Sequence, residues 1–399
     1  MIDKNKIGKN LYELRKKSGI TQDSLAKILN ITPQAISKWE NGITIPDTYL
    51  LPVLSQLYNL PIEALLCVKS YSDRVQDNNS SKVLLPGLKL YTGAPSLISC
   101  IKSSLHYIGI CVSLGWISAP YAFMLNINDS VSSKGTEFWN DRGCFLSHVG
   151  NCGGIIETQT GWKGEKDISE KRNTAWTSIR NAINKGLPCY VWELDKPQYY
   201  LIAGYDDIGY YYFDIDSGNI AGPFPYEDLG NSEWGILEIH IIHPGSISDN
   251  LKSLKDIFEY AITVGNPELY PPNDGYTMGI EAYSVWWNAI ANNTADYYGC
   301  AYNAAFWSHC KSMAVSFLLE AKLRIGIMEE LFDEAIRCYQ SCARSLKKLT
   351  EVYPLMNGAS DITKKHKDEA IHLLQISYRQ EQSGLNNIKN ILDEIYKLW

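Results

Sequence analysis

The chain has 399 residues, 45% of them hydrophobic, and a formal net charge of −7. This length suffices for two or three domains with cores of their own, and the negative balance excludes a protein that coats nucleic acid along its whole length. The charge is uneven: residues 1–67 hold eight Lys and Arg against six Asp and Glu, a balance of +2, so the remaining residues carry −9. Attraction to phosphate is therefore expected only of the N-terminal segment.

No secretory signal is evident, since the apolar residues of the first twenty positions fall at helical spacing among charges. The ten cysteines include no CxxC pair, so we expect no metal and no cofactor. Scattered cysteines of this kind are typical of reduced thiols in the cytoplasm. Residues 103–128 lack charges and are long enough to cross a bilayer, but Gly109, Gly115 and Pro120 interrupt them. Two buried segments joined by a turn are therefore favoured over a membrane span.

The chain opens with a pattern of short helices. Thr21 can cap the second helix, and Thr32 can cap the third, with Pro33 at the first helical position, where its missing N–H costs nothing. The spacing of Ile36 and Trp39 makes them the buried face of this third helix. The residues left facing outward are Gln34, Ser37 and Lys38.

The stretch LRKKSGITQDSLAKILNITPQAISKWENG, residues 14–42, resembles the Cro-repressor-type helix-turn-helix domain, also called the xenobiotic-response-element family. The resemblance covers about residues 4–67 of a predicted domain 1–67. It implies an ion pair between Arg15 and Glu40. The DNA-binding residues that it implies are Gln22, Thr32, Gln34, Ser37, Lys38 and Asn41.

The resemblance also implies a role for each position. The helix that begins near Thr32 lies in the major groove of double-stranded DNA in this family, so Gln34 and Lys38 become candidates for reading base edges, with Ser37 beside them. The residues that become candidates for phosphate contacts at helix ends are Gln22 and Asn41. A protein-interaction module with a solvated polar face is the alternative interpretation.

Residues 68–87, VKSYSDRVQDNNSSKVLLPG, are polar and without periodicity, which predicts a linker. Ten of the eleven Trp and 23 of the 26 Tyr lie after residue 67. This enrichment predicts a large domain with an aromatic-lined interior, rather than a region that only dimerises a DNA-binding module.

Residues 88–247 are predicted to form an α+β domain. The elements expected in it are a helix in 171–186, a strand in 188–194, a hairpin in 198–216 and a strand in 234–242. The hairpin is expected to turn at residues 207–209.

This region resembles papain-like folds of the bacteriocin-processing kind, and more closely the butirosin-biosynthesis acyltransferase family. The shared stretches are GAPSLISCIKSSLHYIG, SAPYAFMLNI, AWTSIRNAINKGLPCYVWEL and YYLIAGYDD. The resemblance covers roughly residues 85–245 and implies a helical continuation packed over the papain-like core.

In papain-like folds of this kind a Cys opens a buried helix, a His begins the strand before GYD, and an Asp ends the next strand. By position, Cys100 stands for the nucleophile and Asp214 for the orienting acid, but Gln198 stands where the His belongs. An amide cannot take a proton from a thiol or stabilise a thiolate, so the resemblance implies a non-catalytic domain. Two alternatives remain: Cys100 is a small buried core residue, or a distant histidine acts as base, namely His106, His148, His240 or His243.

Aromatic and charge-free segments predict a pocket for a small, partly apolar ligand. The residues expected to line this pocket are Cys100, Trp116, Phe123, Trp192, Gln198 and Asp214. The stretch GCFLSHVGNC places Cys144, His148 and Cys152 at helical intervals, but no fourth ligand is evident and its glycines suggest a loop, so a metal site is not favoured.

Residues 248–399 are predicted to form a helical bundle packed on the α+β domain. The apolar stripes of its last two helices are Phe332, Ile336, Tyr339, Ala343 and Leu346, then Leu374, Ile388, Leu392 and Ile395. A further aromatic group, which is either core or a pocket wall, consists of Tyr283, Trp286, Trp287 and Trp307.

The predicted fold class is therefore multidomain: an all-α helix-turn-helix domain, then an α+β papain-like domain that continues into a helical bundle. The favoured function is a cytoplasmic, homodimeric transcriptional regulator that binds an inverted repeat and senses a small molecule. One alternative is a cysteine-dependent acyltransferase or peptidase-like amidase that carries a DNA-binding domain. The other is a repressor whose large domain only dimerises.

Overall fold

The structure is a computed structural model. It describes residues 4–17, 20–29, 31–47, 50–58, 65–66, 82–136, 142–266, 268–269, 275–355 and 363–398. Residues 68–81 of the predicted linker lie outside the described residues. The chain divides into two compact units, one made of residues 1–112 and 154–245, the other of residues 113–153 and 246–399.

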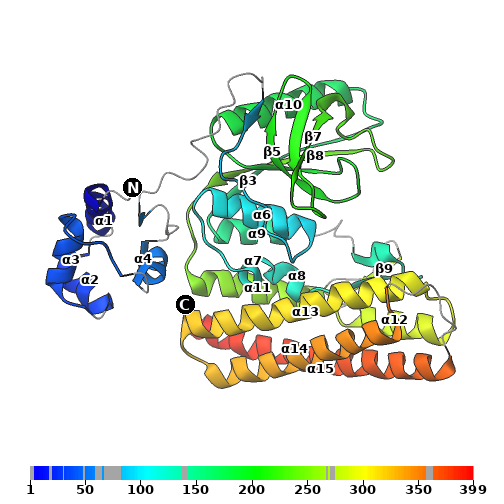
Figure 1. Cartoon of the computed structure of the whole chain (residues 1–399). Coiled ribbons are helices and arrows are strands. Elements are labelled where there is room, and N and C mark those ends of the chain that lie inside the picture. The colour runs from blue at the N-terminus through cyan, green and yellow to red at the C-terminus, as the bar shows by residue number, and fades with distance from the viewer. Residues whose placement is uncertain are drawn as a thin grey trace. The chain divides into compact units, whose positions relative to one another are not determined.

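The N-terminal domain is helical, as predicted. Its helices are α1 (Lys4–Lys17), α2 (Gln22–Leu29), α3 (Pro33–Glu40) and α4 (Leu51–Tyr58) (Figure 1). They enclose a core that includes Ile7, Leu25, Ile36 and Trp39. Gly8 of α1 lies directly against α3, because a Cβ at that position would stand 2.4 Å from the carbonyl oxygen of Trp39. The absence of a side chain there fixes how closely the two helices approach.

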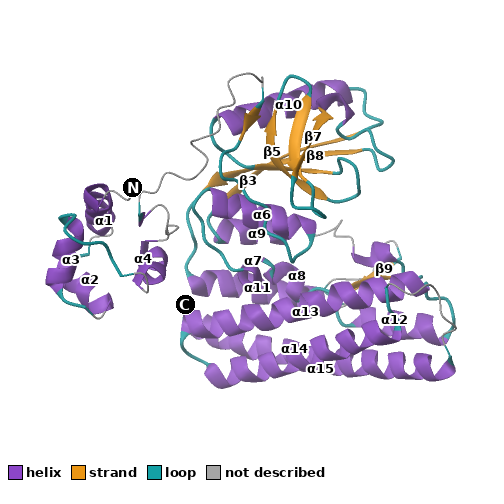
Figure 2. Cartoon of the chain, in the orientation of Figure 1, coloured by secondary structure: helices purple, strands orange, loops and turns teal. Residues whose placement is uncertain are grey.

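The first unit also contains an antiparallel sheet (Figure 2). Its strands are β1 (Val83–Leu84), β3 (Gly154–Trp162), β4 (Cys189–Trp192), β5 (Tyr199–Tyr205), β6 (Gly209–Phe213), β7 (Ile220–Pro225) and β8 (Ile236–Pro244). Within the described residues the strand order is β3-β8-β4-β5-β6-β7, and β1 pairs with β5. The predicted linker was too long at its C-terminal end, because Val83 and Leu84 pair with Tyr205 and Gly204.

Two longer helices cover the sheet on opposite faces, α6 (Ser96–Tyr107) and α10 (Ile168–Asn184) (Figure 1). α6 is fastened to β5 by the Ser96 Oγ, which accepts a hydrogen bond from the Tyr199 N–H at 3.1 Å. On α10, the Trp176 ring packs edge-on against Tyr205 and Tyr210. A short 3₁₀ turn, η4 (Tyr226–Asp228), precedes β8. The helix, strands and hairpin predicted between residues 171 and 242 are confirmed.

The second unit is mainly helical. Its elements are α7 (Leu114–Ile117), α8 (Ala119–Ala122), β2 (Asn126–Asn128), η3 (Ser133–Thr136), α9 (Arg142–Asn151), α11 (Asn250–Gly265), β9 (Tyr276–Met278), α12 (Glu281–Ala291), α13 (Tyr297–Ile325), α14 (Glu329–Val352) and α15 (Lys364–Lys397). The strands β2 and β9 pair antiparallel. The long helices α13, α14 and α15 pack side by side (Figure 1), and the predicted apolar stripes of α14 and α15 are buried.

Two features of this unit differ from expectation. The segment with Cys144, His148 and Cys152 was predicted to be a loop, but residues 142–151 form α9 and the prediction is wrong. Glycine only weakens a helix, by about 1 kcal/mol, and packing can outweigh that cost. In addition, residues 113–153 belong to the helical unit, whereas the predicted boundary lay at residue 247.

Among the helices in the described part of the chain, none combines the length and the apolar character that a bilayer crossing needs.

Candidate functional site

The helix α3 begins and ends at well-defined caps. Thr32, in extended conformation, accepts a hydrogen bond on its Oγ1 from the Ala35 N–H at 3.3 Å, and Pro33 occupies the first helical position. Ile36 and Trp39 are 1% and 6% exposed. The inner face of α3 is thus held in the domain core, as the sequence predicted.

The outer face of α3 is polar. Gln34 and Lys38 are exposed, and Ser37 is half-buried. Asn41, just beyond the helix, donates its side-chain amide to the Ser37 carbonyl at 2.8 Å and to the Ser37 Oγ at 3.3 Å. Two of the residues expected to contact DNA therefore bond to one another and hold the end of the helix.

A buried ion pair joins α1 to the end of α3. The Arg15 guanidinium is bidentate on Glu40, with Nε–Oε1 at 2.5 Å and Nη2–Oε2 at 2.8 Å, and both side chains are 5% exposed. The hydrogen bonds that Arg15 donates to the Glu40 carboxylate raise the pKa of Arg15. Gln22 donates its side-chain amide to Glu40 Oε2 at 2.6 Å. The ion pair implied by the resemblance is present, and its acceptor also fixes Gln22 at the start of α2, a link that sequence alone did not suggest.

The six residues predicted to line a ligand pocket are divided between the units. Cys100, Trp192, Gln198 and Asp214 belong to the first unit, and Trp116 and Phe123 to the second.

Within the first unit, these residues have local partners. Cys100 is wholly buried on α6, and this burial raises the pKa of its thiol. Gln198 donates its amide to the Tyr200 hydroxyl at 2.9 Å. Asp214 accepts from the N–H and the hydroxyl of Ser217, at 2.7 and 2.6 Å, and these bonds lower its pKa. Its carboxylate thus closes the turn after β6.

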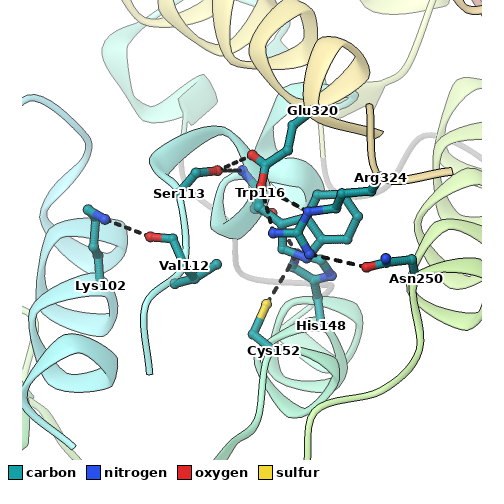
Figure 3. Close-up of polar contacts among 9 residues, drawn as sticks. All are labelled: Lys102, Val112, Ser113, Trp116, His148, Cys152, Asn250, Glu320 and Arg324. Atoms are coloured by element: carbon teal, nitrogen blue, oxygen red, sulfur yellow. Dashed lines mark hydrogen bonds and ion pairs between the residues drawn. The ribbon is translucent and has the colours of Figure 1, made fainter. Parts of the chain in front are cut away.

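Trp116 lies in a polar cluster of the second unit (Figure 3). The Arg324 guanidinium stacks 3.8 Å from the centroid of the Trp116 ring. Arg324 also donates to Glu320, at 2.6 and 3.0 Å, and to the Asn250 side-chain oxygen at 3.2 Å. Glu320 in turn accepts from the Ser113 hydroxyl, which caps α7 through the Trp116 N–H. Sequence reasoning missed this cluster because α7 and α13 lie some two hundred residues apart.

His148 and Cys152 border the same cluster. The His148 Nε2 lies 2.7 Å from the Trp116 carbonyl oxygen and 3.8 Å from the Cys152 Sγ (Figure 3). Burial lowers the pKa of His148 to about 4, since the imidazolium would lose its hydration. The ring is therefore neutral near pH 7, with Nε2 donating to the carbonyl. No group of three or more His, Cys, Asp or Glu suited to a metal ion is found among the described residues.

Phe123 lies in the interior of the second unit. Its ring meets those of Phe258, Phe317 and Tyr339 edge-on, at centroid distances of 6.3, 5.8 and 5.3 Å. It fills this aromatic core together with α11, α13 and α14.

The first unit contains a hollow of about 350 Å³ between β3 and α10. The residues that line it are Gln159, Thr160, Asp167, Glu170, Lys171, Thr174 and Leu237. This hollow is polar, and none of the six predicted pocket residues lines it.

Comparison with known proteins identifies the N-terminal domain. Residues 11–65 match the model of the helix-turn-helix family. The HTH-type transcriptional regulator ImmR of Bacillus subtilis (strain 168) is 38% identical over 78 residues, 20% of this chain and 58% of that protein. The antitoxin PezA of Streptococcus pneumoniae serotype 4 is 37% identical over 54 residues, 14% of this chain and 34% of that protein. The chain thus carries an N-terminal helix-turn-helix domain, and its matches span 58% and 34% of the lengths of these relatives.

Proposed function

We propose that this chain is a DNA-binding transcriptional regulator whose helix α3 enters the major groove. The observation that carries the proposal is the division of α3 into a buried face, Ile36 and Trp39, and an exposed face with Gln34 and Lys38. Gln and Lys can both hydrogen-bond to base edges in the major groove. Two comparisons support the same function: residues 11–65 match the helix-turn-helix family, and a transcriptional regulator is 38% identical over 78 residues.

We further propose that the remaining chain is a papain-like, non-catalytic domain that senses a small ligand and dimerises, with the helical unit as its continuation. An antiparallel sheet packed against the helix that carries Cys100 supports this fold. Gln198 in place of a base and the buried Cys100 thiol support the loss of catalysis.

The test of DNA binding starts from a random-sequence duplex library. Sequences retained by the full chain are cloned, and the best one is labelled for fluorescence anisotropy. Gln34→Ala should weaken binding by about 1–3 kcal/mol and relax the preference at one base position. Lys38→Ala should weaken binding similarly.

Lys9→Ala is the matched control, because Lys9 is an exposed cation that belongs to α1 and not to α3. It should change affinity much less than Lys38→Ala. Unchanged binding by both α3 variants, with their folding intact by circular dichroism, would show that α3 is not the reading helix.

A further inference from the structure

Strand β3 is a long edge of the sheet. In the described part of the chain it pairs on one side only, with β8, in continuous register from Gly154↔Pro244 to Trp162↔Ile236. All nine residues are paired without a bulge. The other side of β3 therefore presents a straight row of backbone N–H and C=O groups, which is a template for another strand.

Alternation along the strand shows which residues direct their backbone N–H and C=O groups away from β8. The Lys163 N–H donates to the Gly235 carbonyl at 2.8 Å, toward β8, whereas the Trp162 N–H is turned to the Glu165 carboxylate at 3.0 Å. Successive residues of a strand direct their backbone groups to opposite sides in an antiparallel ladder. The backbone groups of Ile156, Thr158 and Thr160 therefore point away from β8.

The two edges of the sheet differ in their protection. At the far edge, β7 contains Pro223 and Pro225, and its pairing with β6 is irregular. Proline and irregular pairing are devices that keep an edge from recruiting another strand. β3 has no proline and one charged residue, Glu157, while its Ile155 and Trp162 side chains are 58% and 53% exposed. One edge is thus blocked and the other left open.

We propose that a second copy of this chain pairs with β3 in antiparallel orientation, about a two-fold axis at Thr158. This register sets the nine residues opposite one another. It brings the outward backbone groups of Ile156, Thr158 and Thr160 together, while the Trp162 N–H stays on Glu165. Ile155 then faces Gly161 of the second copy, and Trp162 faces Gly154, so each bulky side chain stands across from a glycine. Glu157 faces Gln159, an amide that can donate to it, whereas moving the register by two residues in one direction would oppose two Glu157 carboxylates.

This interface deepens the proposed function, because it rests on the dimerisation proposed for the large domain. It joins two sheets into one across the molecular two-fold axis, as isologous dimers require. The oligomeric state is measured without DNA, so a failure of the interface and a failure of DNA reading are told apart.

A cysteine at the axis tests the register in the full-length chain. Residues directly opposite in a hydrogen-bonded antiparallel pair have Cα atoms about 5.5 Å apart, a separation that a disulfide spans. Thr158→Cys should therefore give a covalent dimer under mild oxidation, seen on a non-reducing gel and reversed by reductant.

Two controls belong to this experiment. Wild type measures crosslinking through native cysteines such as the exposed Cys111. Thr160→Cys lies on the same exposed edge, but the two Thr160 residues would stand four positions apart along the strands, roughly 13 Å, so it should not crosslink. No crosslink at residue 158, or equal crosslinking at 158 and 160, overturns the proposed register.

A proline variant tests the interface without a crosslink. Thr160→Pro removes an outward N–H, which an edge strand tolerates, and should weaken self-association at least tenfold in analytical ultracentrifugation. Ile220→Lys, on the blocked edge, should leave association unchanged. A wild type that sediments as a monomer at tens of micromolar, or a proline variant that associates as tightly as wild type, overturns the proposal.

Discussion

At the scale of single residues, Cys100 is of a type that can act as a nucleophile, but its environment does not activate the thiol. It is wholly buried, and burial raises its pKa because the thiolate would be left without hydration. We therefore expect iodoacetamide to label Cys100 in the folded chain far more slowly than the exposed Cys111 at every pH from about 5 to 9. Peptide mass spectrometry reads out both sites, and the urea-unfolded chain should label them alike. Rapid labelling of Cys100 at pH 6, abolished by changing one histidine, would instead indicate an acyltransferase or amidase.

The lowered pKa of His148 predicts how the free energy of unfolding changes in acid. Its pKa falls from an ordinary 6.5 to about 4 in the folded chain, so between these values the unfolded chain binds more protons. Stability therefore falls as the pH is lowered through this window. At about 1.4 kcal/mol per unit, the loss between pH 7 and pH 5 is about 2 kcal/mol.

Urea unfolding at both pH values, followed by tryptophan fluorescence, checks this loss. His148→Gln keeps a donor for the Trp116 carbonyl but does not titrate, so its stability should depend less on pH. An equal pH dependence in wild type and variant would assign the effect to other groups.

At the scale of elements, α13 and α15 are joined by an ion pair inside the bundle. Lys311 and Glu381 are 0% and 2% exposed and are paired with one another. Lys311 Nζ also donates to the Met124 carbonyl at 3.0 Å, and the Tyr283 hydroxyl donates to Glu381 at 2.7 Å. Neither charge could be distinguished in the sequence from a solvated helix residue, because the partners are seventy positions apart.

Removing one partner of this pair should leave an uncompensated buried charge. Glu381→Gln is expected to lower the free energy of unfolding by about 3–5 kcal/mol, whereas the double variant Lys311→Met with Glu381→Leu should recover most of the loss. Denaturant titrations of the wild type, Lys311→Met, Glu381→Leu and the double variant form a double-mutant cycle, and Glu381→Gln is measured beside it. If the double variant is as unstable as Glu381→Gln, the polar contacts, and not the balance of charge, stabilise the packing of α13 and α15.

The elements that could be predicted are those with a strong local period. The stripe of α14 and the hairpin of β5 and β6 lie where the sequence predicted them, because in each element the spacing of the apolar residues matches the spacing of the buried side chains. The helix α9 was not predicted because its glycines indicate a loop in spite of the helical spacing. The strand β1 was not predicted because two residues are too few to show an alternating pattern. The division of the pocket residues between two units depends on contacts across hundreds of residues, which no local pattern encodes.

At the scale of the whole molecule, the charges are segregated. The helix-turn-helix segment 1–67 has a balance of +2, and the rest of the chain −9. A domain with so little positive charge gains limited affinity from phosphates alone. Tight and selective binding therefore requires two recognition helices on one duplex, which is the physical reason for proposing a dimer on an inverted repeat.

Such a dimer constrains the spacing of the half-sites to about one helical turn, roughly 34 Å. Inserting five base pairs between them turns the second half-site to the opposite face of the duplex, where the second α3 cannot reach it without distortion. The affinity for the spaced repeat should then fall at least about tenfold, toward that for a single half-site, because the gain from simultaneous engagement is lost when geometry forbids it. Anisotropy titrations with the selected repeat, the spaced repeat and one half-site measure this directly. If the single half-site binds as tightly as the full repeat, the chain reads DNA as a monomer, and the open edge of β3 serves association away from the operator.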